Sequence, residues 1–358
     1  MKKAIDHFPT DGVPVSCEQI KSGHINETYL ITTDCGAQYI LQKINRYVFP
    51  NIKTLMDNVA AVNAFLAERE KGRMTMIRYL DTSDGQSFYD DGNGGAWRLY
   101  RYVAHSLCLQ RPETDEDLYE CARAFGHFQY ALNEFPAEQL EETIRDFHNT
   151  PDRYRQLREA VAADSEGRLD EVREEVAYLL SREEKACRLQ RMRLSGELPV
   201  RVTHNDTKIN NVLLDEDTRK ALCVIDLDTV MPGLSAFDFG DAIRTGASTA
   251  AEDERDLSKV ALDLRLFRAF TRGFLQACPS LTDREREVLP LGAFTMTLEC
   301  GMRFLTDYLM GDKYFAIHYE AHNRDRARAQ LALAKDMETQ EEAMDRIVRE
   351  ETRMGREA

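Results

Sequence analysis

The sequence predicts an α+β fold with two lobes, in which a small antiparallel sheet with one helix precedes a larger, mainly helical part. Three observations lead to this prediction. Short β-branched and aromatic runs between turn residues are concentrated before about residue 103, and helical spacing of apolar residues dominates after it. The length of 358 residues also exceeds that of one small domain. We therefore predict lobes at residues 1–103 and 104–358.

The first lobe is expected to contain strands at TYLITT, AQYILQKI and AWRLYRYV, separated by turn signals such as DGNGG. Between the second and third of these strands, apolar residues recur at Ile52, Leu55, Val59, Val62 and Leu66. This spacing is helical. The pattern therefore predicts a sheet with one interpolated helix.

The second lobe is expected to begin with a helix after Thr114, a suitable N-cap followed by the acidic residues Glu116 and Asp117. The highly charged stretch 152–197 has apolar residues spaced three and four apart, which predicts solvent-facing helices. Helical patterns return at 256–277, 284–309 and 320–354. Only residues 202–230 interrupt them with strand character.

Charge and composition exclude several classes of protein. Sixty-two acidic against 47 basic side chains give a net charge of −15, which disfavours binding to nucleic acids or anionic membranes. Eight cysteines show neither CxxC spacing nor the density of a disulfide scaffold, so reduced core thiols are expected. No apolar stretch approaches the ~18–20 residues of a membrane span, and the first residues lack a signal-peptide pattern. We expect a cytoplasmic enzyme.

Residues 202–230, VTHNDTKINNVLLDEDTRKALCVIDLDTV, are expected to form an antiparallel hairpin of NVLLD and ALCVID. Because the open ends of such a hairpin meet, Asn211 at its start should lie near Asp226 at its end. Asp206, in the loop that enters the hairpin, shares this volume. Oxygen-rich sites of this kind suit Mg²⁺ when it also keeps water and phosphate oxygens. Asp206 is then left to orient a nucleophile.

The spacing His204-x-Asp206-x-x-x-x-Asn211, followed by an apolar strand that ends in Asp226, is typical of the catalytic loop and metal-binding aspartate of kinases. Residue types, spacing and hairpin topology agree. The alternative is an acidic turn beside a core histidine.

A second motif, Asp238-Phe239-Gly240, also matches a kinase metal motif. It lies 27 residues beyond Asn211, after the chain has left the hairpin. Asp238 and Asp241 are therefore expected to be mainly structural, capping the following helix or holding the catalytic loop.

At these residues the chain resembles the aminoglycoside phosphotransferase and choline kinase superfamily, which has a bilobal protein-kinase-like fold. Within it, SGHINETYLI, THNDTKINNVLLD, IDLDTVMPGLSAFDFGDAIR and DYLMGDKYF are similar to the N-acetylhexosamine 1-kinases. The resemblance implies transfer of the γ-phosphoryl group of ATP to the anomeric hydroxyl of N-acetylglucosamine or N-acetylgalactosamine. It makes Asp206 the acceptor of the hydroxyl proton, and Asn211 and Asp226 the ligands of Mg²⁺.

The same resemblance makes SGHINETYLI the loop that covers the nucleotide phosphates. Gly23 would let the backbone approach an anion, and Asn26 and Thr28 would hydrogen-bond within the turn. By itself this segment also fits an ordinary hairpin with a turn glycine.

One departure concerns the phosphate-binding lysine that many relatives carry on the third strand. Gln42 stands in that place and Lys43 follows, and because strand side chains alternate, only one of the two can face the nucleotide. Asp57 is the candidate for the helix carboxylate that pairs with the lysine. Adenine is expected against the backbone around Tyr102 and Val103.

For the amino-sugar substrate, the resemblance points to His24, Arg303 and Tyr314, and Asp228 could support either the metal or the sugar. Two alternatives remain. One is a kinase for another small alcohol, such as an aminoglycoside, a choline-like compound or an amino alcohol. The other is a catalytically inactive kinase-fold binding protein, which Gln42 suggests and the presence of Asp206 disfavours.

Overall fold

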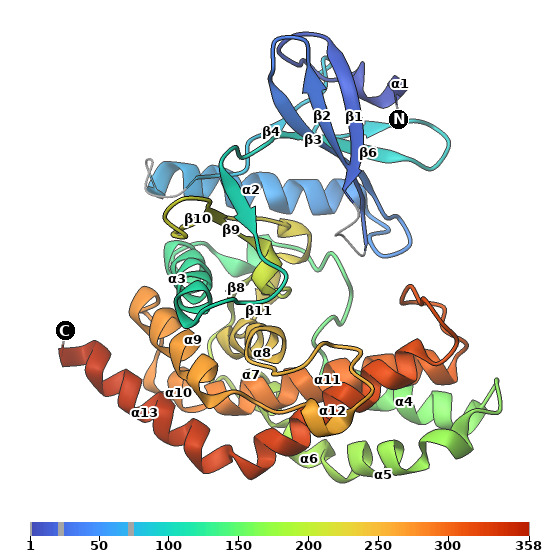
Figure 1. Cartoon of the computed structure of the whole chain (residues 1–358), viewed down its shortest axis with the longest axis vertical. Coiled ribbons are helices and arrows are strands. Elements are labelled where there is room, and N and C mark those ends of the chain that lie inside the picture. The colour runs from blue at the N-terminus through green and yellow to red at the C-terminus, as the bar shows by residue number, and fades with distance from the viewer. Residues whose placement is uncertain (1, 21–24, 71–74, 358) are drawn as a thin grey trace.

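The computed structural model describes residues 2–20, 25–70 and 75–357. An antiparallel sheet lies at one end of the molecule and helices form the rest, with the N-terminus beside the sheet and the C-terminus on the far side of the helical part (Figure 1). This arrangement confirms the predicted α+β class. The predicted boundary at residue 103 falls between the last long strand of the sheet and the next strand, and it stays a prediction.

The N-terminal sheet is entirely antiparallel, with strand order β1-β2-β3-β6-β4 and β5 on β6. Its strands are β1 (Pro14–Ile20), β2 (Glu27–Thr33), β3 (Gln38–Ile44), β4 (Tyr79–Leu80), β5 (Tyr89–Asp90) and β6 (Ala96–Arg101). The predicted interpolated helix is α2 (Ile52–Glu70), which lies between this sheet and the helical part (Figure 1). Pairing of β3 with β6 places Gln42 directly opposite Arg98.

The remaining elements are mostly helical. The helices are α1 (Lys2–Ile5), α3 (Asp115–Ala131), α4 (Thr150–Ala163), α5 (Arg173–Ser181), α6 (Glu183–Ala186), α7 (Arg188–Ser195), α8 (Ser235–Gly246), α9 (Leu264–Ala277), α10 (Asp283–Glu287), α11 (Leu289–Leu309), α12 (His322–Thr339) and α13 (Glu341–Glu357). Short 3₁₀ turns are η1 (Ala137–Gln139), η2 (Leu169–Val172), η3 (Ile209–Asn211), η4 (Leu227–Thr229) and η5 (Leu257–Lys259). Thr114 caps α3 through a capping box with Asp117, as predicted.

The predicted hairpin is formed by β9 (Val212–Asp215) and β10 (Ala221–Val224), and β7 (Ser106–Cys108) pairs with β9. The Ile225 N–H donates to the Asn211 carbonyl at 2.9 Å, which brings the two ends together as expected. The second strand nevertheless stops at Val224. Asp226 adopts a left-handed backbone (φ 60°, ψ 59°), and η4 follows it. Asp228 therefore lies in a 3₁₀ turn and does not continue the strand face of Asp226.

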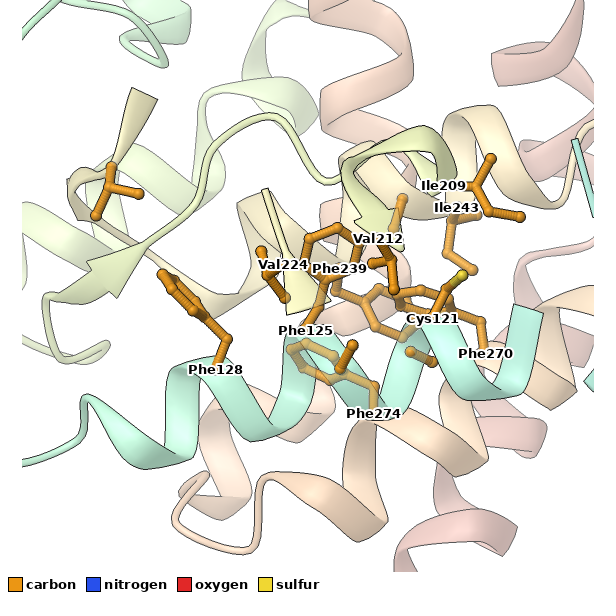
Figure 2. Packing of buried hydrophobic residues seen from close by; sticks show 14 of the residues in the cluster. Cys121, Phe125, Phe128, Ile209, Val212, Val224, Phe239, Ile243, Phe270 and Phe274 are labelled. Carbon is orange, nitrogen blue, oxygen red and sulfur yellow. The ribbon is translucent and has the colours of Figure 1, made fainter. Parts of the chain in front are cut away.

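A buried apolar cluster fixes this hairpin to the helices (Figure 2). Side chains from the hairpin and from η3 pack between α3, α8 and α9. The labelled members are Cys121, Phe125, Phe128, Ile209, Val212, Val224, Phe239, Ile243, Phe270 and Phe274. Complete burial of a large apolar side chain contributes about 1.5–3 kcal/mol. Packing on three helices therefore gives the polar ends of the hairpin a fixed position. Strands β8 (Arg201–Thr203) and β11 (Met231–Gly233) pair beside it.

The Asp238-Phe239-Gly240 motif lies inside α8 and not in a loop. A Cβ atom on Gly240 would lie only 2.3 Å from the carbonyl oxygen of Gly292 on α11. The glycine therefore permits the close crossing of α8 and α11. We expect Gly240→Ala to lower the free energy of unfolding by about 2 kcal/mol, because backbone must shift to admit the methyl group. Urea unfolding followed by circular dichroism measures this loss.

Gly355 provides the matched control, because a Cβ atom there has nothing within 4 Å. It lies in α13, so Gly355→Ala should add up to about 1 kcal/mol of stability through helix propensity. Equal effects of the two alanine variants would contradict the close crossing at Gly240.

Within the described ranges, no helix is both long and apolar enough to cross a membrane. All eight cysteines are free thiols, as their spacing predicts.

Candidate active site

Asp238 on α8 fixes the start of loop 204–211, which leads into the hairpin, by hydrogen bonds to its backbone. Its carboxylate accepts hydrogen bonds from the backbone N–H of His204 at 2.9 Å and of Asn205 at 2.7 Å, and from Gln129 Nε2 at 2.6 Å. Asp238 is only 1% exposed, and burial raises the pKa of its carboxyl group. Its position agrees with the expected structural role.

His204 connects this loop to the end of β10. Its Nε2 lies 2.9 Å from the Ile225 carbonyl and its Nδ1 accepts from the Asp206 N–H at 3.3 Å, which places the ring proton on Nε2. The ring packs edge-on against Phe125 and Phe128 and is fully buried. His204 therefore positions the backbone on both sides of the site and does not itself face a substrate.

Asp206 is the carboxylate that reaches solvent, with 27% of its side chain exposed. Asn211 Nδ2 donates to its Oδ2 at 2.9 Å and to its backbone oxygen at 2.7 Å, and Lys208 Nζ lies 3.2 Å from its Oδ1. Burial alone would raise the pKa of Asp206, but the charge of Lys208 and the hydrogen bonds from Lys208 and Asn211 outweigh burial and lower it. The carboxylate is therefore ionised and able to accept a hydrogen bond.

Lys208 was not among the residues predicted from the sequence. The only signal in the sequence was the spacing, because a lysine two residues after an aspartate in a loop is within reach of its carboxylate. Burial would lower the pKa of Lys208, but the stronger attraction of Asp206 raises it, so the ammonium group is charged.

The predicted metal ligands Asn211 and Asp226 come together at the open end of the hairpin, where both line one pocket. Burial, assisted by the nearby charges of Asp228 and Asp206, raises the pKa of Asp226 to about 7. A divalent cation would relieve this repulsion, and hard oxygen donors suit Mg²⁺. In the part of the chain that is described, no group of three or more His, Cys, Asp or Glu side chains could hold a metal. The oxygen donors of Asn211 and Asp226 fit a Mg²⁺ ion that takes its other ligands from phosphate and water.

A polar row crosses the N-terminal sheet above this site. Gln42 Nε2 donates to Thr28 Oγ1 at 3.1 Å, and Gln42 Oε1 accepts from Arg98 Nε at 3.0 Å and from Nη2 at 2.7 Å. Arg98 also forms a buried ion pair with Asp228. Asn26 Nδ2 donates to the other oxygen of Asp228 at 2.7 Å. Thr28 and Gln42 thus bond within the sheet, whereas Asn26 and Arg98 bond across the cleft to Asp228.

Asp228 joins the two parts of the molecule. Both of its carboxylate oxygens are bonded to the N-terminal sheet side, and its backbone oxygen accepts from Thr143 at 2.8 Å. Its predicted substrate-binding role stays a prediction that this geometry does not favour, because both carboxylate oxygens already have protein partners.

Strand alternation separates Gln42 from Lys43 as expected. Gln42 faces the cleft, whereas Lys43 lies on the opposite face and pairs with Glu27 at 3.2 Å. Asp57 is exposed and pairs with Lys53 at 2.6 Å, so its predicted pairing with a phosphate-binding lysine is wrong.

Two adjacent pockets meet at Asp206. The first lies between the sheet and the hairpin, and the second has a volume of about 430 Å³. Ile25, Asp206 and Lys208 line both. The first pocket is also lined by Asn26, Thr28, Gln42, Arg98, Asn211 and Asp226.

Four other predicted binding residues remain: Gly23, His24, Tyr102 and Val103. Gly23 and His24 lie outside the described residues. Tyr102 and Val103 do not line the first pocket, and Tyr79, Tyr100 and Cys108 line it there instead. The Tyr102 N–H already donates to the Gln38 carbonyl at 3.1 Å, and the Val103 carbonyl accepts from Ser106 Oγ at 2.7 Å.

Arg303 and Tyr314 both line the second pocket, which brings these two predicted residues together. The Arg303 guanidinium lies 5.0 Å from the ring centre of Phe147, 5.8 Å from that of Tyr314 and 5.4 Å from that of Phe315. Asp307 fixes the adjacent turn by accepting the backbone N–H groups of residues 313, 314 and 315 at 2.9 Å.

Most acidic groups in the second pocket already have partners. Glu299 accepts from His148 at 2.9 Å and from Thr150 at 2.6 Å. Arg244 pairs with Glu252 at 2.6 Å and with Oδ1 of Asp241 at 2.7 Å. The second carboxylate oxygen of Asp241 is buried and has no hydrogen-bond partner within the described chain.

A sheet-and-helix cleft with an aspartate, an amide and a second aspartate at a hairpin end defines a phosphoryl-transfer class of protein. The model of the phosphotransferase enzyme family matches residues 16–275, and the chain belongs to this family.

Solved structures support the fold. An aminopropanol kinase is 18% identical, with a TM-score of 0.67 and coverage of 96% of this chain and 97% of that one. An aminoglycoside phosphotransferase from Alicyclobacillus acidocaldarius is 14% identical, with a TM-score of 0.61 and coverage of 98% and 96%. A choline kinase from Cryptosporidium parvum is 12% identical, with a TM-score of 0.57 and coverage of 92% and 91%. These similarities confirm the kinase-like α+β architecture.

Proposed function

We propose that the chain is an ATP-dependent small-molecule kinase that phosphorylates a hydroxyl group held in the second pocket. One observation carries this proposal: the Asp206 carboxylate lies at the junction of a pocket lined by the predicted metal ligands and a separate pocket for an acceptor. An in-line phosphoryl transfer requires the attacking hydroxyl and the leaving oxygen on opposite sides of the transferred phosphorus, and two pockets that meet at Asp206 allow this arrangement.

In this proposal Asp206 orients the acceptor hydroxyl and takes its proton. The hydroxyl oxygen forms a bond to the γ-phosphorus, and the bond from that phosphorus to the bridging oxygen breaks, leaving ADP. Lys208, 3.2 Å from Asp206, lies where it can stabilise charge on the transferred group. Bound Mg²⁺, held by Asn211 and Asp226, would neutralise phosphate charge.

We propose the anomeric hydroxyl of an N-acetylhexosamine as the acceptor, giving a sugar 1-phosphate. The aromatic residues around Arg303 can pack against a sugar ring, and the guanidinium can donate to hydroxyl or acetamide oxygens. The pairing of Glu299 and Glu252 with protein groups also favours a neutral acceptor over a cationic one.

A cationic amino alcohol or aminoglycoside is the second candidate. The similar structures include an aminopropanol kinase, a choline kinase and an aminoglycoside phosphotransferase. The unpartnered oxygen of Asp241 is the specific feature that favours this candidate, because a buried carboxylate oxygen can accept from an ammonium group.

A substrate panel separates the two candidates. N-acetylglucosamine, N-acetylgalactosamine, aminopropanol, choline and kanamycin are each incubated with ATP and Mg²⁺, and products are followed by phosphorus NMR. A sugar 1-phosphate shows coupling to the anomeric proton. Turnover of a cationic alcohol without sugar turnover would establish the second candidate, and absence of any ATP-dependent product would contradict the kinase proposal.

If the acceptor is the sugar, Arg303→Met should raise its KM by about tenfold, because loss of one or two hydrogen bonds costs roughly 1–1.5 kcal/mol. The KM for ATP should not change, since Arg303 does not line the first pocket. Steady-state kinetics measure both constants. Arg191→Met on the exposed face of α7 is the control and should change neither constant. An unchanged sugar KM in the Arg303 variant would remove this residue from acceptor binding.

A further inference from the structure

Arg98 is a buried cation in the first pocket. It lies on β6, its side chain is only 1% exposed, and it lines the pocket together with Asp206, Asn211 and Asp226. Burial of a guanidinium is costly unless charged or polar groups compensate it. Packing alone therefore does not explain why a charged arginine is buried at this position.

The neighbours of Arg98 hold its guanidinium plane in one orientation. Nε and Nη2 both donate to Oε1 of Gln42, and Nη1 pairs with Asp228. The fork has five N–H groups, and these three contacts to oxygen leave two. One of the two faces the sulfur of Met56 at 4.0 Å. The guanidinium thus retains donor capacity after its protein contacts are made.

The acidic lining of the first pocket means that an anionic ligand needs a cationic side chain to bind there. Asp206 and Asp226 line the pocket, and the buried Asp228 lies behind Arg98. A triphosphate entering this volume would meet the carboxylates of Asp206 and Asp226, so it needs positive charge from the walls of the pocket. Of the described residues that line the pocket, only Arg98 and Lys208 are basic. Lys208 already lies beside Asp206 on the opposite wall.

The register of the sheet explains why an arginine can serve from β6. Thr28, Gln42 and Arg98 are consecutive partners across β2, β3 and β6, so their side chains form one row on the cleft face. Gln42, in the middle of the row on β3, carries no charge, but Arg98 on the neighbouring strand β6 supplies a cation. Lys43, on the other face, cannot reach this volume.

We propose that Arg98 is the side chain of the sheet that binds the nucleotide phosphates, and that Gln42 is a positioning residue that fixes its guanidinium. This inference rests on the proposed kinase function. Arg98 takes over the electrostatic task that a lysine at position 42 would perform.

The test compares affinities for ATP, ADP and adenosine by isothermal titration calorimetry, with Mg²⁺ present. Arg98→Gln should weaken ATP and ADP binding by roughly 10- to 100-fold, as expected for a charge-assisted hydrogen bond, and leave adenosine binding unchanged. A merely structural Arg98 would weaken all three ligands alike or none. The exchange variant Gln42→Lys/Arg98→Gln should recover most of the lost ATP affinity.

Arg98→Gln leaves Asp228 buried without its cation, so a second variant guards against misfolding. Arg98→Met/Asp228→Asn removes both charges and should keep a cooperative unfolding transition while still losing ATP relative to adenosine. A folded variant with an unchanged ratio of ATP to adenosine affinity overturns the inference about Arg98. If the wild-type protein binds adenosine and ATP equally well, the proposed kinase function itself fails.

Discussion

Asp206→Asn should lower kcat by roughly 10²- to 10⁴-fold, the usual contribution of a positioned general base. Asparagine keeps the shape of the side chain and can still accept a hydrogen bond from Asn211 Nδ2. It cannot take the proton of an acceptor hydroxyl. Nucleotide affinity should stay within a few-fold of the wild-type value, because the sheet side of the first pocket is untouched. Single-turnover phosphoryl transfer and nucleotide titration measure the two quantities.

Asp217→Asn is the matched control, because Asp217 lies in the exposed turn of the same hairpin. It should keep the wild-type rate. If Asp206→Asn also keeps its rate while remaining folded, Asp206 has no part in proton transfer. If instead both rate and nucleotide affinity fall together, its role is to hold the metal and not the proton.

The meeting of Asn211 with Asp226 could be predicted from the sequence because it depends on local rules. Strand runs separated by a short charged turn form an antiparallel pair, and pairing alone brings the two ends together. The buried state of Val212 and Val224 fixes the register of this pair. The spacing of residues along one hairpin therefore determines most of the relative position of Asn211 and Asp226.

The environment of Asp228 could not be predicted in this way. Its orientation depends on the left-handed backbone at Asp226, an infrequent conformation for a residue other than glycine. It also depends on which strand pairs with β3. Only the pairing of β3 with β6 places Arg98 beside Gln42, and this contact joins residues 56 positions apart. The periodicity of apolar residues identifies strands, but it does not show which strands pair in the sheet.

The predicted nucleotide contacts at Tyr102 and Val103 also depend on structure that the sequence does not reveal. Their position after the last long strand could be predicted from the sequence. Whether their backbone groups are free to bind a nucleotide depends on hydrogen bonds to residues distant in the sequence. The Tyr102 N–H is bonded to β3. The aromatic wall of the pocket comes instead from Tyr79 and Tyr100, which are opposite each other on paired strands.

Asp238→Ala should produce the largest loss of stability, about 3 kcal/mol or more. The substitution leaves three buried donors without an acceptor: the backbone N–H groups of His204 and Asn205 and the side-chain amide of Gln129. Each unsatisfied buried group costs about 1–3 kcal/mol, and water can reach only some of them after relaxation. Because the two N–H groups belong to loop 204–211, kcat should fall as well. Urea unfolding and steady-state kinetics measure the two losses.

Asp238→Asn separates hydrogen bonding from charge. Its remaining oxygen can still accept from Asn205, and the unpartnered Oε1 of Gln129 can accept from the new amide if the Gln129 amide rotates. The His204 N–H and the rotated Gln129 amino group then lack partners, but the bond to Asn205 is kept and Gln129 Oε1 gains one. The asparagine variant should therefore lose less stability than the alanine variant. The same order is expected for kcat, since the loop is displaced less. Equal losses in both variants would mean that the negative charge of Asp238, and not its role as an acceptor, holds the loop.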